Sequence, residues 1–286
     1  MSPARSTVSV AAAAATLLFL YGSVMTRLVH DWLNDDNYSH GVLILPLALY
    51  FVWERRRRLA ALPPAPSLSG LVILAAGLAT LFAGLLGAEL FLTRISLLFV
   101  LAGSVVFVWG WATLKTVAFP LLFLLLMIPI PAIIFNQIAF PLQLLASKAG
   151  EAGLNAAGVP VLREGNVMIL ANTTLEVAQA CSGIRSLISL LTLGIVFGYF
   201  TDSRGSVRFA IAAATVPIAI VTNGLRVAGT GIAAHYIGPE AAEGFFHTFS
   251  GWLVFIVAFA LMFLLTRLLL RLLPPAVPAG VAPMAA

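Results

Sequence analysis

The stretch TFSGWLVFIVAFALMFLLTRLLL, residues 248–270, contains a single charged side chain, that of Arg267. A helix needs about 20 mostly apolar residues to cross the hydrocarbon core of a bilayer, so this stretch predicts a membrane-spanning helix. Seven other apolar runs are candidates of the same kind, namely 9–29, 38–53, 68–88, 95–112, 116–135, 184–200 and 208–233. The sequence therefore predicts an all-α polytopic membrane protein with about eight transmembrane helices.

The composition agrees with a membrane location. Of the 286 residues, 61% are hydrophobic and 9% are charged, whereas about 25% of the residues of a soluble domain are charged. So few charges cannot cover a water-facing surface, which excludes an ordinary soluble enzyme and a disordered chain. The single cysteine, Cys181, excludes an internal disulfide and a cysteine-rich metal site. We expect no metal and no other cofactor, and no nucleic-acid partner, because the basic residues cluster at helix ends.

The distribution of Lys and Arg predicts the orientation of the chain, since these residues favour cytoplasmic loops. With the N-terminus inside, the inner ends of the predicted helices hold ten Lys and Arg residues and the outer ends hold six. Both termini are therefore predicted to be cytoplasmic. The segment from Glu54 to Ser69 is then a basic, proline-rich inner loop, and Cys181 and all four histidines fall on the outer side.

The longest gap between predicted spans, residues 136–183, has its own pattern. Pro129 and Pro131 are expected to kink or end the preceding helix, and Phe140–Leu154 is amphipathic, which favours an interfacial or re-entrant helix. Residues 159–170 then alternate around Gly165 as in a β-hairpin. We therefore expect a small extracytoplasmic β-hairpin and an interfacial helix before Cys181, within a single integral membrane domain spanning residues 1–273. Residues 274–286 read as a disordered Pro/Ala tail.

Three polar clusters interrupt the predicted helix ends, and charges at membrane depth are costly and often functional. Cys181 and Arg185 lie four residues apart and share a helical face. Asn223 and Arg226 share a face of the run 208–233, and His247 begins the last run, with His235 as a weaker rival. Each also has a plain structural interpretation: an inert packed cysteine, an arginine that extends to the headgroups, and a histidine in an aromatic belt.

Together the three clusters suggest a reaction. A cysteine and a histidine that are distant in sequence and brought together by a fold form a nucleophile with its base, and an arginine supplies positive charge for an oxyanion. A fourth segment in the first outer loop, Tyr38-Ser39-His40, either supports such a site or caps the following helix. Arg185 and Asn223 are further supporting candidates.

Four motifs resemble the exosortase/archaeosortase family: ACSGIRS at 180–186, NGLR at 223–226, Phe246-His247 ahead of Ser250-Gly251, and YSHG at 38–41. The resemblance implies a membrane-embedded cysteine transpeptidase with Cys181 as nucleophile, Arg226 as cationic stabiliser and His247 as acid/base. It also implies membrane-anchored substrate proteins that carry a C-terminal PEP-CTERM-type sorting signal. The site would face outward from a bacterial inner membrane.

Other functions stay open at this point. A transporter or channel would place polar residues through several helices near the midplane. A serine intramembrane protease would use Ser182 or Ser186, and a non-catalytic component of a polysaccharide-export system would need no nucleophile. Gly194 and Gly198 either face a substrate helix or join their helix to a neighbour inside the protein.

Overall fold

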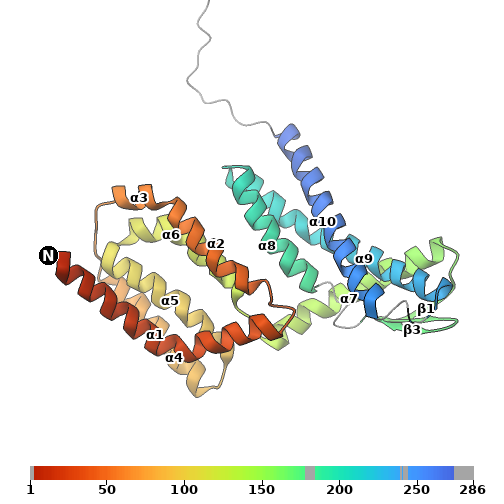
Figure 1. Ribbon diagram of the computed structural model, residues 1–286, viewed down its shortest axis with the longest axis horizontal. Coiled ribbons are helices and arrows are strands. Elements are labelled where there is room, and N and C mark those ends of the chain that lie inside the picture. Colours follow the sequence, from red (N-terminus) through yellow and green to blue (C-terminus); the bar gives the residue numbers. More distant parts are fainter. Residues whose placement is uncertain (1–2, 178–183, 239, 241–243, 274–286) are drawn as a thin grey trace, which may run out of the picture. The chain divides into compact units, whose positions relative to one another are not determined.

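The computed structural model describes residues 3–177, 184–238, 240 and 244–273 (Figure 1). The chain forms two compact units, Met1–Ile134 and Phe135–Ala286. The prediction of a single integral domain over residues 1–273 concerns how these units combine, and it stays a prediction. Cys181 and Ser182 lie outside the described residues.

The N-terminal unit is helical. Its elements are α1 (Pro3–Asn34), α2 (Gly41–Glu54), α3 (Arg56–Ala61), α4 (Ser69–Leu86), α5 (Leu90–Trp109), α6 (Trp111–Phe123) and the short 3₁₀ helix η1 (Leu124–Met127). Tyr21 and Val24 of α1 pack with Leu81 of α4 and Val100 of α5 in one buried cluster. The hydroxyl groups of Tyr21 and Ser96 share a hydrogen bond of 3.0 Å inside this unit.

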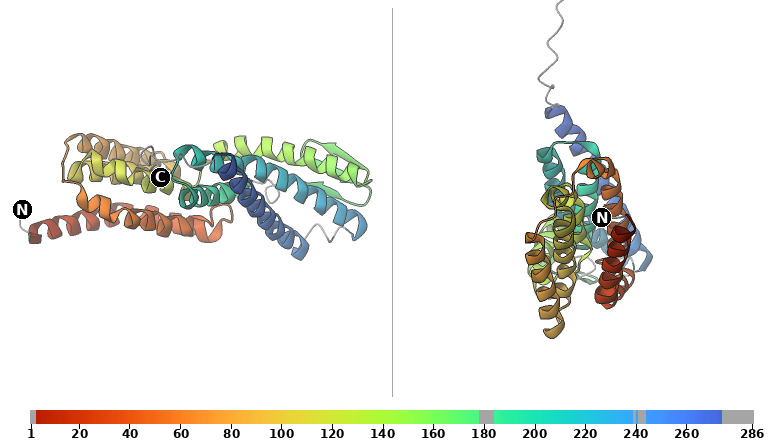
Figure 2. Two further views of the ribbon diagram at one scale, coloured as in Figure 1. Left: turned by 90° about the horizontal axis from the view of Figure 1, so that it is seen from above. Right: turned by 90° about the vertical axis from the view of Figure 1, so that its left-hand side faces the viewer.

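Glycines let α4 and α5 approach closely as an antiparallel pair (Figure 2). A Cβ atom built at Gly70 would lie 2.3 Å from the backbone nitrogen of Phe107, and one at Gly103 would lie 2.6 Å from that of Leu74. Neither neighbour can yield, because both are backbone atoms. The small residues at this interface therefore set the spacing of the two helices.

We expect Gly70→Ala to destabilise the N-terminal unit by about 1–3 kcal/mol, because overpacking forces the backbone of the two helices apart. Gly22→Ala is the matched control, since a Cβ at Gly22 would meet nothing within 4 Å. That control is expected to be neutral or slightly stabilising, as alanine favours the helix over glycine. Thermal unfolding of the purified proteins in detergent measures both effects. Equal midpoints for the two variants would contradict the close packing.

The C-terminal unit combines helices with a small sheet. Its elements are α7 (Ala132–Ala156), which begins at the junction of the units, β1 (Val161–Glu164), β2 (Val167–Leu170), β3 (Thr174–Glu176), α8 (Ile184–Thr201), α9 (Gly205–Tyr236) and α10 (Gly244–Leu272). Leu190 of α8, Ala219 of α9 and two residues of α10, Ala258 and Met262, form a buried cluster. This cluster holds α8, α9 and α10 together.

Gly194 and Gly198 join α8 to α9. A Cβ atom at Gly194 would lie 2.4 Å from Cγ2 of Thr215, and one at Gly198 would lie 3.4 Å from the Cα of Arg208. Of the two interpretations that the sequence left open, contact with a neighbouring helix of the same unit is the one that the structure shows.

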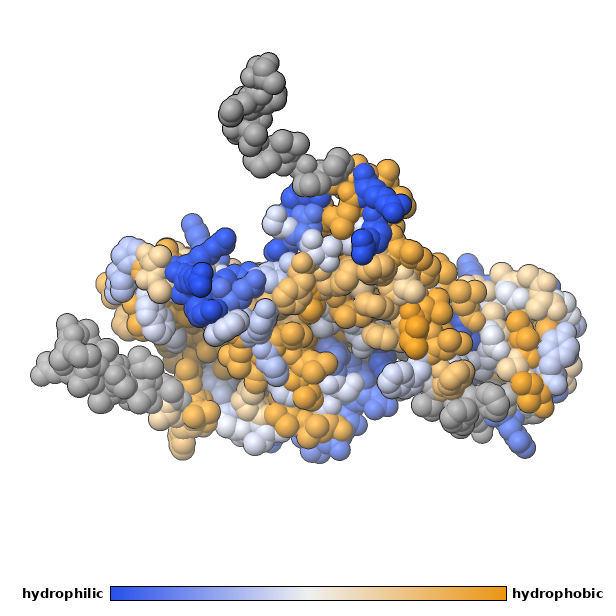
Figure 3. Space-filling model, turned by 45° about the horizontal axis from the view of Figure 1, so that its top comes forward, coloured by the Kyte–Doolittle hydropathy of each residue, from blue (hydrophilic) through white to orange (hydrophobic). Residues whose placement is uncertain are grey.

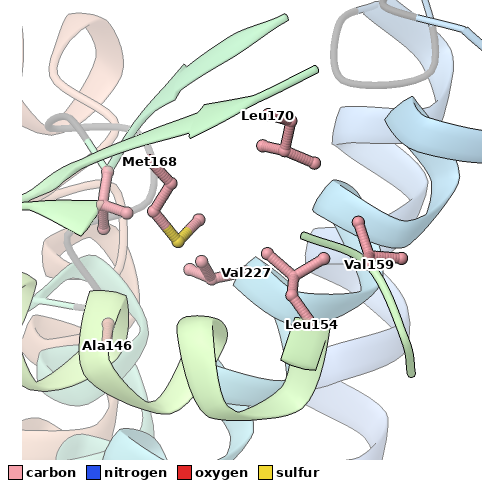
Figure 4. Packing of buried hydrophobic residues seen from close by; sticks show 7 residues of the cluster. Ala146, Leu154, Val159, Met168, Leu170 and Val227 are labelled. Atoms are coloured by element: carbon pink, nitrogen blue, oxygen red, sulfur yellow. The ribbon is translucent and has the colours of Figure 1, made fainter. Parts of the chain in front are cut away.

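The three strands form an antiparallel sheet in the order β1-β2-β3. One face of the sheet packs on α7 and α9, where Met168 and Leu170 meet Ala146, Leu154 and Val227 (Figure 4). Ser147 of α7 donates a hydrogen bond of 2.9 Å to the carbonyl of Gly165, and Arg163 donates one of 2.6 Å to Glu151. These contacts fix the sheet against the helix that precedes it.

The structure confirms a helical membrane protein with a small β element, and it does not confirm eight spans. In the described part of the chain, four helices are long and apolar enough to cross a membrane: α4, α5, α9 and residues 249–272 of α10. A fifth span results if Trp111–Met127 and Ala132–Ala156 form one bent pair, whereas α2 and Arg185–Thr201 are shorter apolar helices. Hydrophobic side chains cover much of the helical surface that Figure 3 shows.

Some predicted boundaries were wrong. The run 116–135 is not one helix, because α6 ends at Phe123, η1 ends at Met127 and α7 begins at Ala132. Pro129 and Pro131 explain the break, since proline lacks an N–H group and disfavours a helical residue before it. The interfacial helix predicted over 140–154 accordingly begins earlier. α2 begins at Gly41, so Tyr38, Ser39 and His40 lie in the preceding turn, and the short helix α3 was not foreseen in the segment 54–69.

Candidate functional site

Arg226 is a cation within an otherwise apolar stretch of α9. Its Nε donates a hydrogen bond of 3.3 Å to the hydroxyl of Ser250 in α10, and a Cβ atom at Gly251 would lie 3.6 Å from its Nη2. Asn223, one turn earlier on α9, is only 3% exposed. Ser250 and Gly251 therefore form the side of α10 that faces the guanidinium.

A groove of about 330 Å³ lies beside this pair, between α9 and α10. Its polar lining comes from Arg226, Ser250 and two threonines, and its remaining walls are apolar; the full lining is Thr222, Leu225, Arg226, Gly229, Thr230, Ala233, Phe249, Ser250, Leu253, Val254 and Val257. A fixed guanidinium in an apolar groove can stabilise negative charge that develops on a bound group, because its field is weakly screened there.

α8 and α9 pack against each other as an antiparallel pair, and their register predicts which part of α9 lies near the start of α8. Gly198 lies beside Arg208, and Gly194 lies beside Thr215. Ile184 lies ten residues before Gly194 on α8, and Leu225 lies ten residues after Thr215 on α9. Because both helices rise about 1.5 Å per residue, the two segments have the same length. Counted from the contact of Gly194 with Thr215, this register predicts that Ile184, the first residue of α8, lies near the level of Leu225. Arg185 follows as an exposed residue in the first turn of α8.

Two of the predicted catalytic residues are not placed at the level of their side chains. Cys181 lies outside the described residues, three positions before α8. The backbone of His247 belongs to the first turn of α10, and its side chain lies outside the described residues. Their contact with Arg226 stays a prediction.

The predicted supporting residues of the first loop make contacts within the N-terminal unit. The hydroxyl of Tyr38 accepts a hydrogen bond of 3.2 Å from the backbone N–H of Ile130. His40 donates one of 3.0 Å from Nε2 to the carbonyl of Leu126, and Ser39 donates one of 3.2 Å to the carbonyl of Asp36. Tyr38 and His40 thus satisfy backbone groups where the prolines interrupt the helix. Their predicted role toward a substrate stays a prediction.

The contacts of His40 predict a pH dependence of stability. Burial lowers the pKa of His40 below its ordinary value of 6.5, and its Nδ1 is buried with no hydrogen-bond partner among the described residues. The unfolded chain therefore binds a proton at a higher pH than the folded one, so stability is lost as the pH falls below about 6.5.

We expect the thermal midpoint to fall between pH 7.5 and pH 5.5, and to fall by a few degrees less in His40→Gln. Glutamine keeps an N–H donor for the carbonyl of Leu126 but does not titrate. Identical pH profiles of the two proteins would show that His40 does not carry this dependence.

The structure adds two polar pairs that the sequence reasoning missed. Ser250 belongs to the motif in which Phe246-His247 precedes Ser250-Gly251, but no role was predicted for it. It lies three residues after His247 on α10. Arg94, near the start of α5, received no role either; it is 3% exposed and forms a 2.5 Å ion pair with Asp31 of α1. The signal in each case was a polar residue inside an apolar helix.

The family model for the transmembrane exosortase matches residues 32–264, which is more than half of the chain and includes every candidate site residue named above. Searches of curated proteins and of solved structures returned no match. The match runs from the end of α1 into α10 and so takes in the groove beside Arg226, and the chain belongs to the transmembrane exosortase family.

Proposed function

We propose that this protein is a cysteine-dependent membrane transpeptidase or protease that cleaves C-terminal PEP-CTERM-type sorting signals on the extracytoplasmic side. One observation carries the proposal: Arg226 lies in an apolar groove between α9 and α10, hydrogen-bonded to Ser250. Family membership supports the reaction class. The substrates would be membrane-anchored proteins of a bacterial inner membrane, with both termini of the enzyme in the cytoplasm.

Cys181 is the proposed nucleophile. It precedes Ile184 by three residues, and three residues span at most about 11 Å. The covalent chain therefore keeps its Cα within that distance of the first residue of α8. A helix N-terminus and a nearby cation such as Arg185 both favour the thiolate, which is the reactive form.

His247 is the proposed acid and base. It lies three residues before Ser250 and four before Gly251, and both of these face Arg226. Residues three and four apart lie on the same side of a helix, so this spacing predicts that His247 shares the side of α10 that holds Ser250 and Gly251. An imidazole suits proton transfer near neutral pH.

The reaction would proceed in two stages. The Cys181 thiolate attacks the scissile carbonyl carbon, a C–S bond forms, and Arg226 stabilises the oxyanion. The C–N bond then breaks as the His247 imidazolium gives its proton to the leaving amine, which leaves a thioester. An amine acceptor or water, deprotonated by His247, attacks the thioester carbonyl and releases the thiolate.

Capture of the thioester tests this function. The enzyme is co-expressed with a membrane-anchored protein that ends in a PEP-CTERM-type signal, quenched in acid and analysed by mass spectrometry. We expect an acyl adduct on Cys181 that neutral hydroxylamine removes, because hydroxylamine cleaves thioesters. Shortened substrate without any hydroxylamine-sensitive adduct, even in rapidly quenched samples, would contradict the covalent mechanism.

A further inference from the structure

The third strand of the sheet has one edge paired and one edge open. The N–H of Leu170 donates to the carbonyl of Thr173, and the N–H of Val177 donates to that of Asn166, both at 2.8 Å. Met168 stands opposite Leu175 between these pairs. Residues 173, 175 and 177 thus direct their backbone groups toward β2. Because these directions alternate along an antiparallel strand, the N–H and C=O groups of Thr174 and Glu176 point to the opposite edge.

This outer edge of β3 is accessible within the described part of the chain. β3 is the last strand of the order β1-β2-β3, and Thr174 and Glu176 are both exposed. Among the described residues, no backbone hydrogen bond joins Thr174 or Glu176 to another residue on that side. An edge of this kind is a template for a further extended chain.

We propose that the outer edge of β3 binds the substrate as an extended peptide, which adds a fourth strand to the sheet. This inference rests on the proposed function. Glu176 precedes Cys181 by five residues, which span at most about 18 Å, so a peptide on this edge lies within reach of the nucleophile. Strand addition holds a peptide extended through main-chain hydrogen bonds. It would therefore present the scissile carbonyl without requiring particular side chains at the paired positions.

The size of the edge favours a peptide over a second copy of the protein. β3 has three residues, which extend over about 10 Å. A stable interface between two proteins buries about 1,200 Å² or more, and so short a strand supplies only a small part of that area. A substrate peptide needs only a few hydrogen bonds here, because the proposed site binds it elsewhere as well.

The opposite edge of the sheet provides a matched control. β2 uses residues 166, 168 and 170 toward β3, so Val167 and Ile169 face β1, where Glu164 and Leu162 stand opposite them. Val161 and Arg163 therefore direct their backbone groups away from β2, as Thr174 does on the other side. A proline at position 161 or 174 removes one outward N–H and leaves the bonds within the sheet intact.

The experiment compares Thr174→Pro with Val161→Pro and with Thr174→Ala, which keeps the N–H group. We expect Thr174→Pro to lower kcat/KM about tenfold, mainly through a higher KM, and the two controls to stay within about twofold of wild type. Thermal midpoints verify that each variant folds. Thr174→Pro that folds and processes as fast as wild type would overturn the inference and leave the proposed function standing. Wild-type protein that leaves the substrate intact would overturn the proposed function.

A crosslinking measurement covers the case in which Thr174→Pro does not fold. The photoreactive residue p-benzoylphenylalanine is placed at position 174 or at position 161 of the full-length chain. We expect the substrate to crosslink at 174 and not at 161. Equal crosslinking at both positions, or none at 174, would overturn strand addition at β3.

Discussion

Cys181→Ala is expected to lower substrate processing at least about a thousandfold, because it removes the atom that forms the acyl-enzyme. Cys181→Ser should be nearly as inactive, since a hydroxyl group is not ionised where a thiolate would be and is a weaker nucleophile. Processing is measured as the fraction of shortened substrate in membranes at equal enzyme levels. Both side chains are small, so the thermal midpoint should change little.

Ser182→Ala is the matched control, because Ser182 is the adjacent residue and one of the two candidate nucleophiles, with Ser186, of the serine-protease alternative. We expect it to process substrate within a few fold of wild type. Activity that survives Cys181→Ala and disappears in Ser182→Ala would reverse the two roles. Unchanged processing in both variants would exclude Cys181 and Ser182 as nucleophiles, and Ser186→Ala then tests the remaining serine of the segment 180–186.

The long apolar runs predicted the C-terminal helices well. The runs 208–233 and 248–270 became α9 (Gly205–Tyr236) and α10 (Gly244–Leu272), since a continuous stretch of about 20 apolar residues has few alternatives to a helix in a membrane. The run 116–135, drawn from hydropathy alone, was too long, whereas the expectation that Pro129 and Pro131 would kink or end its helix agrees with the break between Met127 and Ala132. Two prolines in a strongly apolar stretch still remove N–H groups and break the helix.

The contacts of the candidate site could be predicted only in part. Helical spacing indicated that Asn223 and Arg226 share one side of α9, because that relation is local. The partner of Arg226 is Ser250, 24 residues away on another helix, and no periodicity encodes such a pair. The same holds for the bond between His40 and the carbonyl of Leu126, which lies 86 residues further along. The hydrogen bond of His40 depends on which carbonyl groups Pro129 and Pro131 leave without a helical N–H partner.

Arg226→Lys is expected to lower kcat about a hundredfold with a smaller change in KM, as for the loss of an oxyanion donor that acts in the transition state. A guanidinium presents five N–H donors in one plane, so its Nε can bond Ser250 while its Nη groups serve a bound substrate. An ammonium keeps the charge but cannot fix its donors in that arrangement. Single-turnover rates with saturating substrate measure the effect.

Ser250→Ala separates the geometry of the guanidinium from its charge. In the wild-type background we expect a loss of about three- to tenfold, because Arg226 loses a hydrogen bond that orients it. In the Arg226→Lys background the same substitution should cost no further activity, since the effects of residues that act through one contact are not additive.

Arg271→Lys, at the far end of α10, is the control for a general effect of replacing arginine and should retain activity. Arg226→Lys that keeps kcat within threefold of wild type would show that positive charge alone suffices, and fully additive losses would show that Ser250 does not act through Arg226.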